Sequence, residues 1–393
     1  MTPRTPVRIF VLIDALGWPV ISKLDFLNDL LPHRRPLRTI LGYSSGAIPS
    51  ILTGRVPAEH GHWNLFYYDP VGSPFRWLRA LSFLPAGLLD NRVGRRVLKE
   101  IGRRLLGLGP LFEVCVPPRL LPWFNWIEKR NIYAPGGIAG EGSIFDELER
   151  SNVPHQVYSY HQHTDAEILR LALEDLEGGR RGVFFLYLSE LDGFLHGHCE
   201  PDEALQERLD RYADGLRRLF VRARTLDPDA TLTVLSDHGM APVHHTHDLV
   251  ARVERLGLTM PADYLAVYDS TMARFWPFTD RARQALLEVL TTTPSGRLLG
   301  DAELKELGIL FPDRRYGELV FLLDPGWLIG GTDFSGPGWR PAGMHGYHPD
   351  DPDSDAVYLS SHEPPVALRT ITDIHPLMLQ AARAVAISRE PSP

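Results

Sequence analysis

Apolar segments with strand character alternate along this chain with amphipathic helical segments, and several of the apolar segments end in Asp or His. The strand-like segments cover residues 7–14, 37–43, 155–160, 182–192, 231–237, 264–269 and 318–324. Helical periodicity is clearest at residues 165–177, 201–226 and 280–292. Buried strands that alternate with helices predict an α/β fold, with a mostly parallel central sheet and helices on both of its faces.

Two regions interrupt this alternation in a chain of 393 residues, a length that suits one large α/β domain with additions. Residues 71–143 are rich in Arg, Trp, Leu and Pro without a clear strand, and we interpret them as an inserted cap that sets specificity. Residues 270–340 combine a helix, a strand and a Gly/Pro-rich stretch, so we expect a smaller accessory subdomain there. The prediction is therefore a single domain over residues 1–393.

Composition and charge narrow the class of protein. Hydrophobic residues make up 44% of the chain and charged residues 23%, as in an ordinary soluble globular protein. The formal net charge of −8 argues against a nucleic-acid polymer as partner, because proteins that bind one carry a basic excess. A small phosphorylated substrate remains compatible with this charge, because bound metal ions would supply positive charge locally.

The termini and the cysteines bear on location. The apolar run at residues 7–13 is too short for a signal peptide, and no segment approaches the roughly 18 continuous apolar residues of a membrane span. Two cysteines, Cys115 and Cys199, imply no disulfide framework. We therefore expect a cytoplasmic protein. The basic amphipathic stretch at residues 92–112 could rest on a membrane surface, although the solvated face of a cap helix is the simpler interpretation.

Two adjacent serines offer a nucleophile. Ser44 and Ser45 follow the strand-like segment at 37–43 and precede an apolar helical stretch. Backbone N–H groups at a helix N-terminus favour phosphoryl oxygens, and a serine hydroxyl attacks once a base or a metal ion lowers its pKa. We predict Ser44 as the nucleophile, with Ser45 as the alternative. A pair of helix-capping serines is the structural explanation that competes with both.

Acidic residues and histidines follow the strand-like segments in a pattern that suits metal ions. Asp237 and His238 leave a buried strand at a Gly turn, so both can reach one ion. Asp192 and His196 lie four residues apart, and one helical turn would put them on the same face. The candidate metal ligands are Asp14, Ser44, Asp192, His196, Asp237, His238 and His345. Alternatives beside these candidates are Glu190, His198 and His348.

Together these motifs resemble the alkaline phosphatase superfamily and, within it, the type I phosphodiesterase/nucleotide pyrophosphatase group. The matching features are Asp14, a nucleophile ten residues before Gly54, P-x-x-H-G at 57–61, D-x-x-x-H at 192–196, SDHGM at 236–240 and HGY at 345–347. They cover residues 7–70 and 144–385, and residues 71–143 match nothing in the family. The resemblance implies an alkaline phosphatase-like fold.

The resemblance also implies two zinc-type ions. One would take Asp14, Ser44, Asp237 and His238, and the other would take Asp192, His196 and His345. Independently of the family, mixed carboxylate and imidazole ligands suit zinc, with manganese or iron as alternatives. A pair of such ions would clamp the attacking and leaving oxygens of an in-line displacement.

The implied function is a metal-dependent phosphoric ester hydrolase, a phosphodiesterase or pyrophosphatase that forms a phosphoserine on Ser44. Alternatives are a phosphomonoesterase or phosphonate-type hydrolase, and, from another class, a non-catalytic binding protein that retains the metals. The family asparagine expected three residues after the nucleophile is Ala47 here. Its contact with a phosphoryl oxygen would pass to a backbone N–H or another side chain, for which Asn64 is the candidate.

Overall fold

A computed structural model describes residues 5–81, 89–108, 112–114, 116–138, 140, 142–333 and 339–388 of the chain. Parts of the predicted regions 71–143, 92–112 and 270–340 lie outside these residues, as does Cys115.

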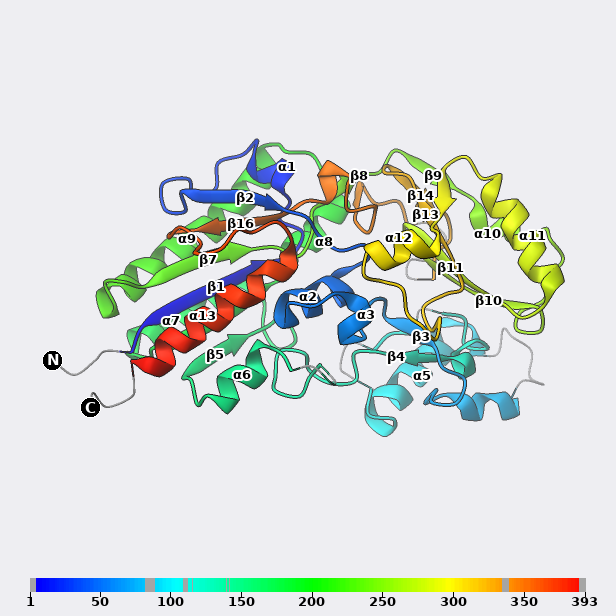
Figure 1. Ribbon diagram of the computed structural model, residues 1–393, viewed down its shortest axis with the longest axis horizontal. Coiled ribbons are helices and arrows are strands. Elements are labelled where there is room, and N and C mark those ends of the chain that lie inside the picture. The colour runs from blue at the N-terminus through cyan, green and yellow to red at the C-terminus, as the bar shows by residue number, and fades with distance from the viewer. Residues whose placement is uncertain are drawn as a thin grey trace.

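A six-stranded sheet lies at the centre of the fold (Figure 1). Its order is β2 (His33–Leu37), β16 (Ala356–Ser360), β7 (Thr231–Leu235), β1 (Val7–Ile13), β6 (Gly182–Leu188) and β5 (His155–Tyr158). The four strands from β7 to β5 are parallel, and β16 is antiparallel to both of its neighbours. β1 and β6 are buried almost throughout, as their continuous apolar sequences predict.

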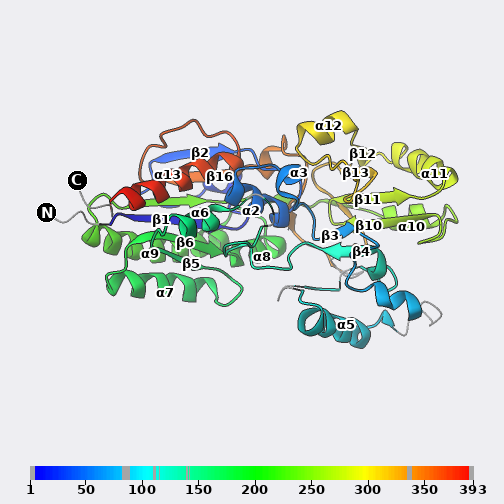
Figure 2. The same cartoon turned by 60° about the horizontal axis from the view of Figure 1, so that its bottom comes forward.

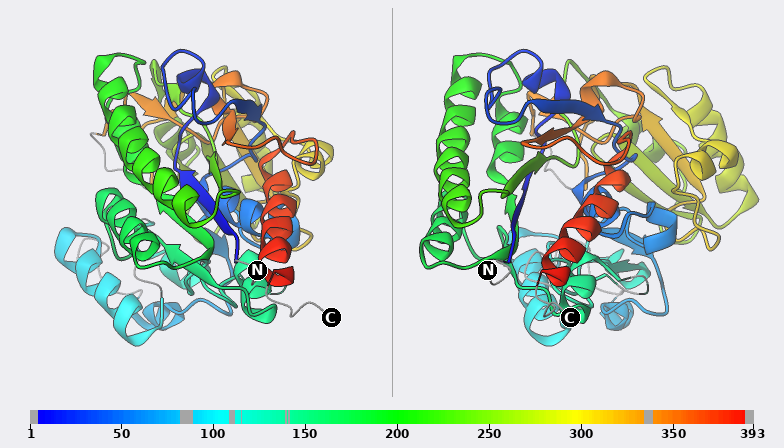
Figure 3. Two further views of the ribbon diagram at one scale, coloured as in Figure 1. Left: turned by 90° about the vertical axis from the view of Figure 1, so that its left-hand side faces the viewer. Right: turned by 60° about the vertical axis from the view of Figure 1, so that its left-hand side comes forward.

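Helices cover both faces of this sheet. On one face α7 (Asp165–Glu177) and α9 (Glu203–Leu226) bury their leucines against the sheet. On the other face lie α2 (Ser44–Thr53), α6 (Ile144–Arg150) and α13 (Ile374–Ile387). Figure 2 and the left view of Figure 3 show the sheet between these two layers. The predicted α/β architecture, mostly parallel with helices on both faces, is confirmed.

The strand expected over residues 37–43 is wrong in position. β2 occupies His33–Leu37 instead. The residues that follow β2 lead to the start of α2, and Ile40 and Leu41 among them are buried in the same apolar cluster as α2. β2 lies at the edge of the sheet, where the missing N–H of Pro36 costs little. The Arg-rich, Pro-containing sequence of β2 has a low strand propensity. The segment forms a strand because it pairs with β16.

A second, antiparallel sheet lies beside the first. Its order is β10 (Tyr264–Asp269), β11 (Met272–Pro277), β13 (Leu319–Leu323) and β12 (Gly296–Leu298). The alternation with helices predicts that the strand-like segments at 264–269 and 318–324 join the central sheet. This prediction is wrong, because both segments belong to the second sheet. The helices α10 (Leu249–Glu254), α11 (Asp280–Thr291) and α12 (Asp301–Glu306) belong to this part of the chain. The short helix α3 (Pro57–His60) comes earlier, directly after α2. The boundaries 270–340 of an accessory subdomain stay a prediction.

The region between residues 71 and 143 packs against this second sheet. It contains α5 (Arg92–Leu105), short 3-10 turns at Arg76–Leu81 and Leu121–Trp123, and β4 (Phe124–Trp126). β4 pairs with β3 (Phe66–Tyr68), and its aromatic side chains share a buried cluster with Leu265 and Trp276 of the second sheet. Its role as a specificity cap stays a prediction.

Candidate metal centre and adjoining cavity

The ends of three parallel strands bring acidic residues to one edge of the central sheet. The strand register sets the end of β1 beside the ends of β6 and β7. Asp14 follows β1, and Asp237 and His238 follow β7. Each of these three residues offers a ligand atom within 4.8 Å of the other two, and all three are buried.

A second group forms beside the first. Asp192 and His196 lie on α8 (Glu190–Gly197), which follows β6, and their side chains share one face as their spacing predicts. His345 completes this group, again with ligand atoms within 4.8 Å. The pairing of two short strands brings His345 to this position. β15 (Gly343–Met344), which directly precedes His345, pairs with β8 (Ala241–Pro242), which follows His238 closely in the chain. The rings of His238 and His345 stack at 3.8 Å between centroids.

The alternative ligands point elsewhere. The carboxylate of Glu190 accepts a hydrogen bond from the backbone N–H of Asp165. His198 pairs with Asp202 at 2.9 Å, and His348 lies 3.4 Å from Glu303.

Two of the imidazoles are oriented in the same way. Nδ1 of His196 lies 2.9 Å from the carbonyl oxygen of Gly343, and Nδ1 of His238 lies 2.9 Å from that of Gly239. With the Nδ1 proton donated to a carbonyl, Nε2 keeps its lone pair. Each Nε2 faces the carboxylate of its own group, at 3.4 Å and 3.3 Å respectively. Metal-binding histidines are oriented by such second hydrogen bonds.

The chemistry of both groups fits divalent cations. Buried atoms without a hydrogen-bond partner include Asp14 Oδ1, Asp192 Oδ1, Asp237 Oδ2 and His345 Nδ1. Burial, followed by the charges of Asp237 and Asp192, raises the pKa of Asp14 well above its usual value. Burial and the neighbouring His238 hold the pKa of His345 well below its usual value, so this imidazole is neutral. Clustered buried carboxylates are costly without a compensating cation, and these oxygen and nitrogen donors suit one.

The two candidate nucleophiles face different surroundings. Ser44 is the first residue of α2, and its Oγ lies 3.0 Å from Nε2 of His238. Ser45 is buried, and its hydroxyl donates to the carbonyl oxygen of Trp63 at 2.8 Å. Within the described part of the chain, no acceptor takes the backbone N–H of Ser44 or Ser45, which leaves two donors at the start of α2 for an anion.

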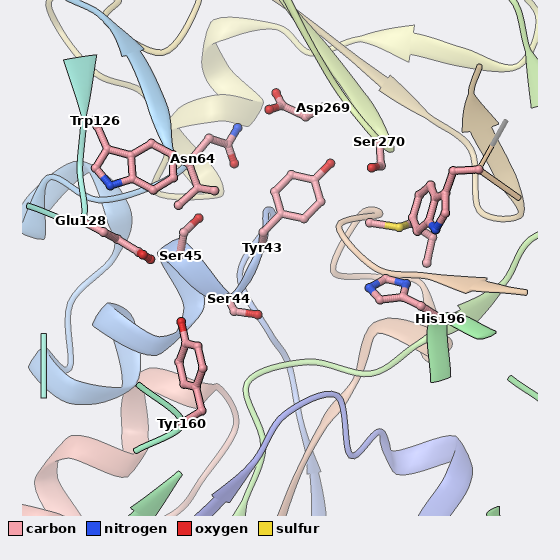
Figure 4. Close-up of a pocket in the computed structure, with 13 residues that line it drawn as sticks. Tyr43, Ser44, Ser45, Asn64, Trp126, Glu128, Tyr160, His196, Asp269 and Ser270 are labelled. Atoms are coloured by element: carbon pink, nitrogen blue, oxygen red, sulfur yellow. The ribbon is translucent and has the colours of Figure 1, made fainter. Parts of the chain in front are cut away.

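A cavity of about 570 Å³ adjoins the two candidate ligand groups (Figure 4). Ser44 lies between the side formed by Ser45, Glu128 and Trp126 and the side formed by His196. Asn64 also lines it, and its Oδ1 has no hydrogen-bond partner. An organic group attached to phosphorus at Ser44 would therefore have room to extend into this cavity.

Three features of the site carry no signal in the sequence. Tyr187, one more apolar β-former in its strand, donates its hydroxyl to Oδ2 of Asp14 and stacks on Tyr133 at 5.3 Å. Glu128 reaches the cavity from the region 71–143, in which the sequence alone indicated no site residue. Asp269 lines the cavity while paired with the buried Arg274. Each depends on contacts between distant segments.

The family model described as type I phosphodiesterase / nucleotide pyrophosphatase matches residues 9–348. The chain belongs to this family. The resemblance read from the motifs is thereby confirmed, and the protein is a hydrolase of the phosphodiesterase/nucleotide pyrophosphatase type. A comparison with curated proteins finds no match.

Solved structures share the fold. Murine ectonucleotide pyrophosphatase/phosphodiesterase 5 superposes with a TM-score of 0.67 at 15% identity, over 96% of this chain and 95% of that one. Its human counterpart has a TM-score of 0.68 at 14% identity, over 96% and 95% of the two chains. Phosphonoacetate hydrolase from Sinorhizobium meliloti, in complex with phosphonoacetate, has 0.64 at 13% identity, over 98% and 96%. These likenesses confirm the alkaline phosphatase-like fold.

Two expectations on location stay predictions. Among the described residues, no helix combines the length and the apolar character needed to cross a lipid bilayer. The cytoplasmic location is untested by this finding. The basic stretch at 92–112 forms α5 over residues 92–105, with Val93, Val97 and Leu105 exposed beside its arginines, and residues 109–111 lie outside the described part.

Proposed function

We propose that this family member is a phosphodiesterase that uses two divalent metal ions and Ser44 as a covalent nucleophile. The observation that carries the proposal is the position of Ser44 Oγ, 3.0 Å from His238 of one ligand group, in a cavity shared with His196 of the other. Zinc is the first candidate for the metal, with manganese and iron as alternatives. The ligands would be Asp14, Asp237 and His238 with Ser44 for one ion, and Asp192, His196 and His345 for the other.

The chemistry divides between the ions and the chain. When bound, the two cations supply the positive charge that favours the ionised Ser44 hydroxyl and offsets negative charge on the leaving oxygen. The Ser44 oxygen attacks phosphorus, the bond from phosphorus to the leaving oxygen breaks, and the leaving oxygen departs as the alcohol while the phosphoryl group stays on Ser44 with its remaining ester substituent. Attack by water on phosphorus then breaks the bond to Ser44 and releases the phosphomonoester.

Neighbouring groups would hold the phosphoryl oxygens during both steps. The free N–H groups of Ser44 and Ser45 at the start of α2 supply two donors. Asn64 lines the same cavity, and rotation of its amide by half a turn would present Nδ2. No further general base would be needed if bound cations favour the ionised form of the Ser44 hydroxyl.

A diester suits the cavity better than a bare phosphate. The roughly 570 Å³ beside Ser44 exceeds what a phosphoryl group fills and would hold an organic substituent. An inactive form of the murine relative is known in complex with AMP, a phosphate ester of a nucleoside. A nucleotide-like ester is therefore one substrate class to test.

The direct test compares esters on protein freed of metal and reloaded with zinc, manganese or iron. We expect hydrolysis of bis-p-nitrophenyl phosphate to exceed that of p-nitrophenyl phosphate and of phosphonoacetate, with two metal equivalents bound. A preference for the monoester or for the phosphonate would establish one of the alternative activities instead. Absence of all turnover with both ions bound would identify a non-catalytic metal-retaining protein.

The ligand assignment has its own readout. His345→Ala should bind one metal equivalent fewer than the wild type, and His348→Ala, the neighbouring histidine outside both groups, should bind as many as the wild type. Retention of two equivalents by His345→Ala would contradict the assignment of the second site.

A further inference from the structure

Helix α5 of the inserted region is held to the fold along one side only. Leu98 and Gly102 are buried on that inner side, and a Cβ at Gly102 would meet the ring of Phe112 at 2.7 Å. Leu98 and Phe112 belong to the apolar cluster that joins this region to the second sheet. Figure 2 shows α5 at the periphery of the molecule, apart from the central sheet. The opposite side of the helix therefore faces solvent.

The outer side of α5 combines cationic and apolar side chains. Six of the fourteen residues of the helix are basic and one, Glu100, is acidic. Val93 is 72% exposed and Val97 is 51% exposed, although burial of such side chains is favourable. Helical spacing arranges the exposed residues in two adjacent rows, one of Arg92, Arg96 and Arg103 and the other of Val93, Val97 and Arg104. These six residues form the α5 surface.

The protein neutralises this surface only in part. Glu100 pairs with Arg104 at 2.7 Å and lies 3.6 Å from Arg103. Within the described part of the chain, no carboxylate pairs with Arg92 or Arg96. The row of arginines thus keeps positive charge that an anionic partner can neutralise.

A hollow of about 600 Å³ lies against the arginine row. Its cationic lining comes from Arg92, Arg95, Arg96, Lys99 and Arg103. The two acidic residues that also line it are already paired, Glu100 with Arg104 and Glu113 with Lys99. Guanidinium groups bind phosphate oxygens through charge-assisted hydrogen bonds, so the hollow suits a phosphate headgroup.

The charge of the whole chain has the opposite sign. Its formal net charge is −8, so an anionic surface would repel most of the molecule and attract α5, which orients the encounter. A partner that binds by charge alone, such as a nucleic acid, gives no reason for the exposed valines. A lipid surface does, because it takes up apolar side chains beside cations that reach the headgroups.

We propose that the α5 surface docks on an anionic lipid surface. The helix lies in the plane of the interface, with its arginines at the phosphate headgroups and Val93 and Val97 at the boundary of the acyl chains. This docking goes beyond the proposed phosphodiesterase activity and does not depend on it, since none of the described residues of α5 lines the cavity beside Ser44.

The test measures co-sedimentation of the full chain with vesicles of phosphatidylcholine, either alone or with about one third phosphatidylserine. The wild type should bind the mixed vesicles at least about tenfold more tightly than the neutral ones, and binding should weaken as salt rises from about 0.1 M to about 0.5 M. Arg92→Gln combined with Arg96→Gln should lower the partition onto mixed vesicles at least about tenfold. Val93→Gln combined with Val97→Gln should lower it at least about fivefold.

Helix α9 supplies matched controls. Arg211→Gln combined with Arg218→Gln removes two charges from exposed positions of that helix, and Val221→Gln removes a valine that is 64% exposed. These control proteins should bind vesicles as the wild type does. All variants should keep the wild-type circular dichroism spectrum and melting temperature, because each change lies on the surface.

The outcomes separate lipid from other partners. Equal binding of the wild type to both kinds of vesicle, or binding to neither, would refute the proposal. Loss of binding in the arginine variant with unchanged binding in the valine variant would also refute it, and would indicate a surface for an acidic polymer instead. If a variant unfolds, the dependence of wild-type binding on lipid charge and salt still decides. Because binding is measured without hydrolysis, failure of the proposed function would leave these results unchanged.

Discussion

The adjacent serines allow a matched pair of variants in which the same atom is removed from two different surroundings. Ser44→Ala deletes a partly exposed hydroxyl, 3.0 Å from His238 Nε2, that the proposed reaction requires. Ser45→Ala deletes a buried hydroxyl that donates to the carbonyl oxygen of Trp63 at 2.8 Å. The two variants should therefore fail in opposite ways.

The magnitudes follow from these contacts. Loss of the Ser44 nucleophile should lower kcat for a diester at least about 10³-fold, since the remaining groups can only polarise the substrate. Its stability should change by less than about 0.5 kcal/mol, because the side chain is not part of the packed core. Ser45→Ala leaves a buried carbonyl without its donor, which should cost about 1–3 kcal/mol of unfolding free energy, with kcat within a few-fold of the wild type.

Three measurements separate the possibilities: steady-state hydrolysis of bis-p-nitrophenyl phosphate, metal content of the purified variants, and urea unfolding. Acid-quenched wild type should in addition carry a phosphoryl group on the peptide that contains Ser44. Both variants should keep a metal content close to that of the wild type. A Ser44→Ala protein that retains near-wild-type turnover, beside an inactive Ser45→Ala protein, would refute the assignment of the nucleophile.

Three further predictions concern groups around the site. Tyr187→Phe removes the hydroxyl that donates to Asp14, so we expect metal affinity to fall about 10–100-fold in a competition titration with a chelator, and unchanged affinity would show that this hydroxyl does not position the ligand. Arg274→Met leaves buried Asp269 without its partner and should cost about 3–5 kcal/mol in urea unfolding, whereas Arg274→Met with Asp269→Leu should recover most of that loss; equal losses would argue against the ion pair as the cause. Because the folded-state pKa of Glu128 is raised to about 7, the stability tied to its protonated form is present at low pH and is lost as pH rises through that value, so Glu128→Gln should gain in melting temperature over the wild type between about pH 5 and about pH 8. A constant difference across that range would contradict the burial of the carboxyl.

Local sequence signals were sufficient to predict the layers of the fold. The buried strands β1, β6 and β7 are rich in apolar and β-branched residues, and α7 and α9 show regular helical spacing with a capping Thr164 and Asp202 at their starts. They failed at β2, where pairing with β16 overrides a low strand propensity, and where strands share a pattern but belong to different sheets, as β10 and β13 do.

The sequence alone predicts that residues at the ends of parallel strands lie close together, because such strands end at the same edge of their sheet. Asp14 and Asp237 needed no more than that rule to be placed together. The choice between Ser44 and Ser45 needed the tertiary structure, since the two differ only in whether the hydroxyl faces His238 or a backbone carbonyl.

By itself, the sequence determined the chemical type of this protein: the order of elements and the kinds of side chain that follow the strands. Only the tertiary structure decided what surrounds that chemistry. Tyr187 beside Asp14, and Glu128 in a cavity that Trp126 and Tyr160 also line, arise from packing between segments far apart in the chain. Local residue patterns record propensity and periodicity, whereas burial and the absence of a compensating charge are properties of the folded neighbourhood.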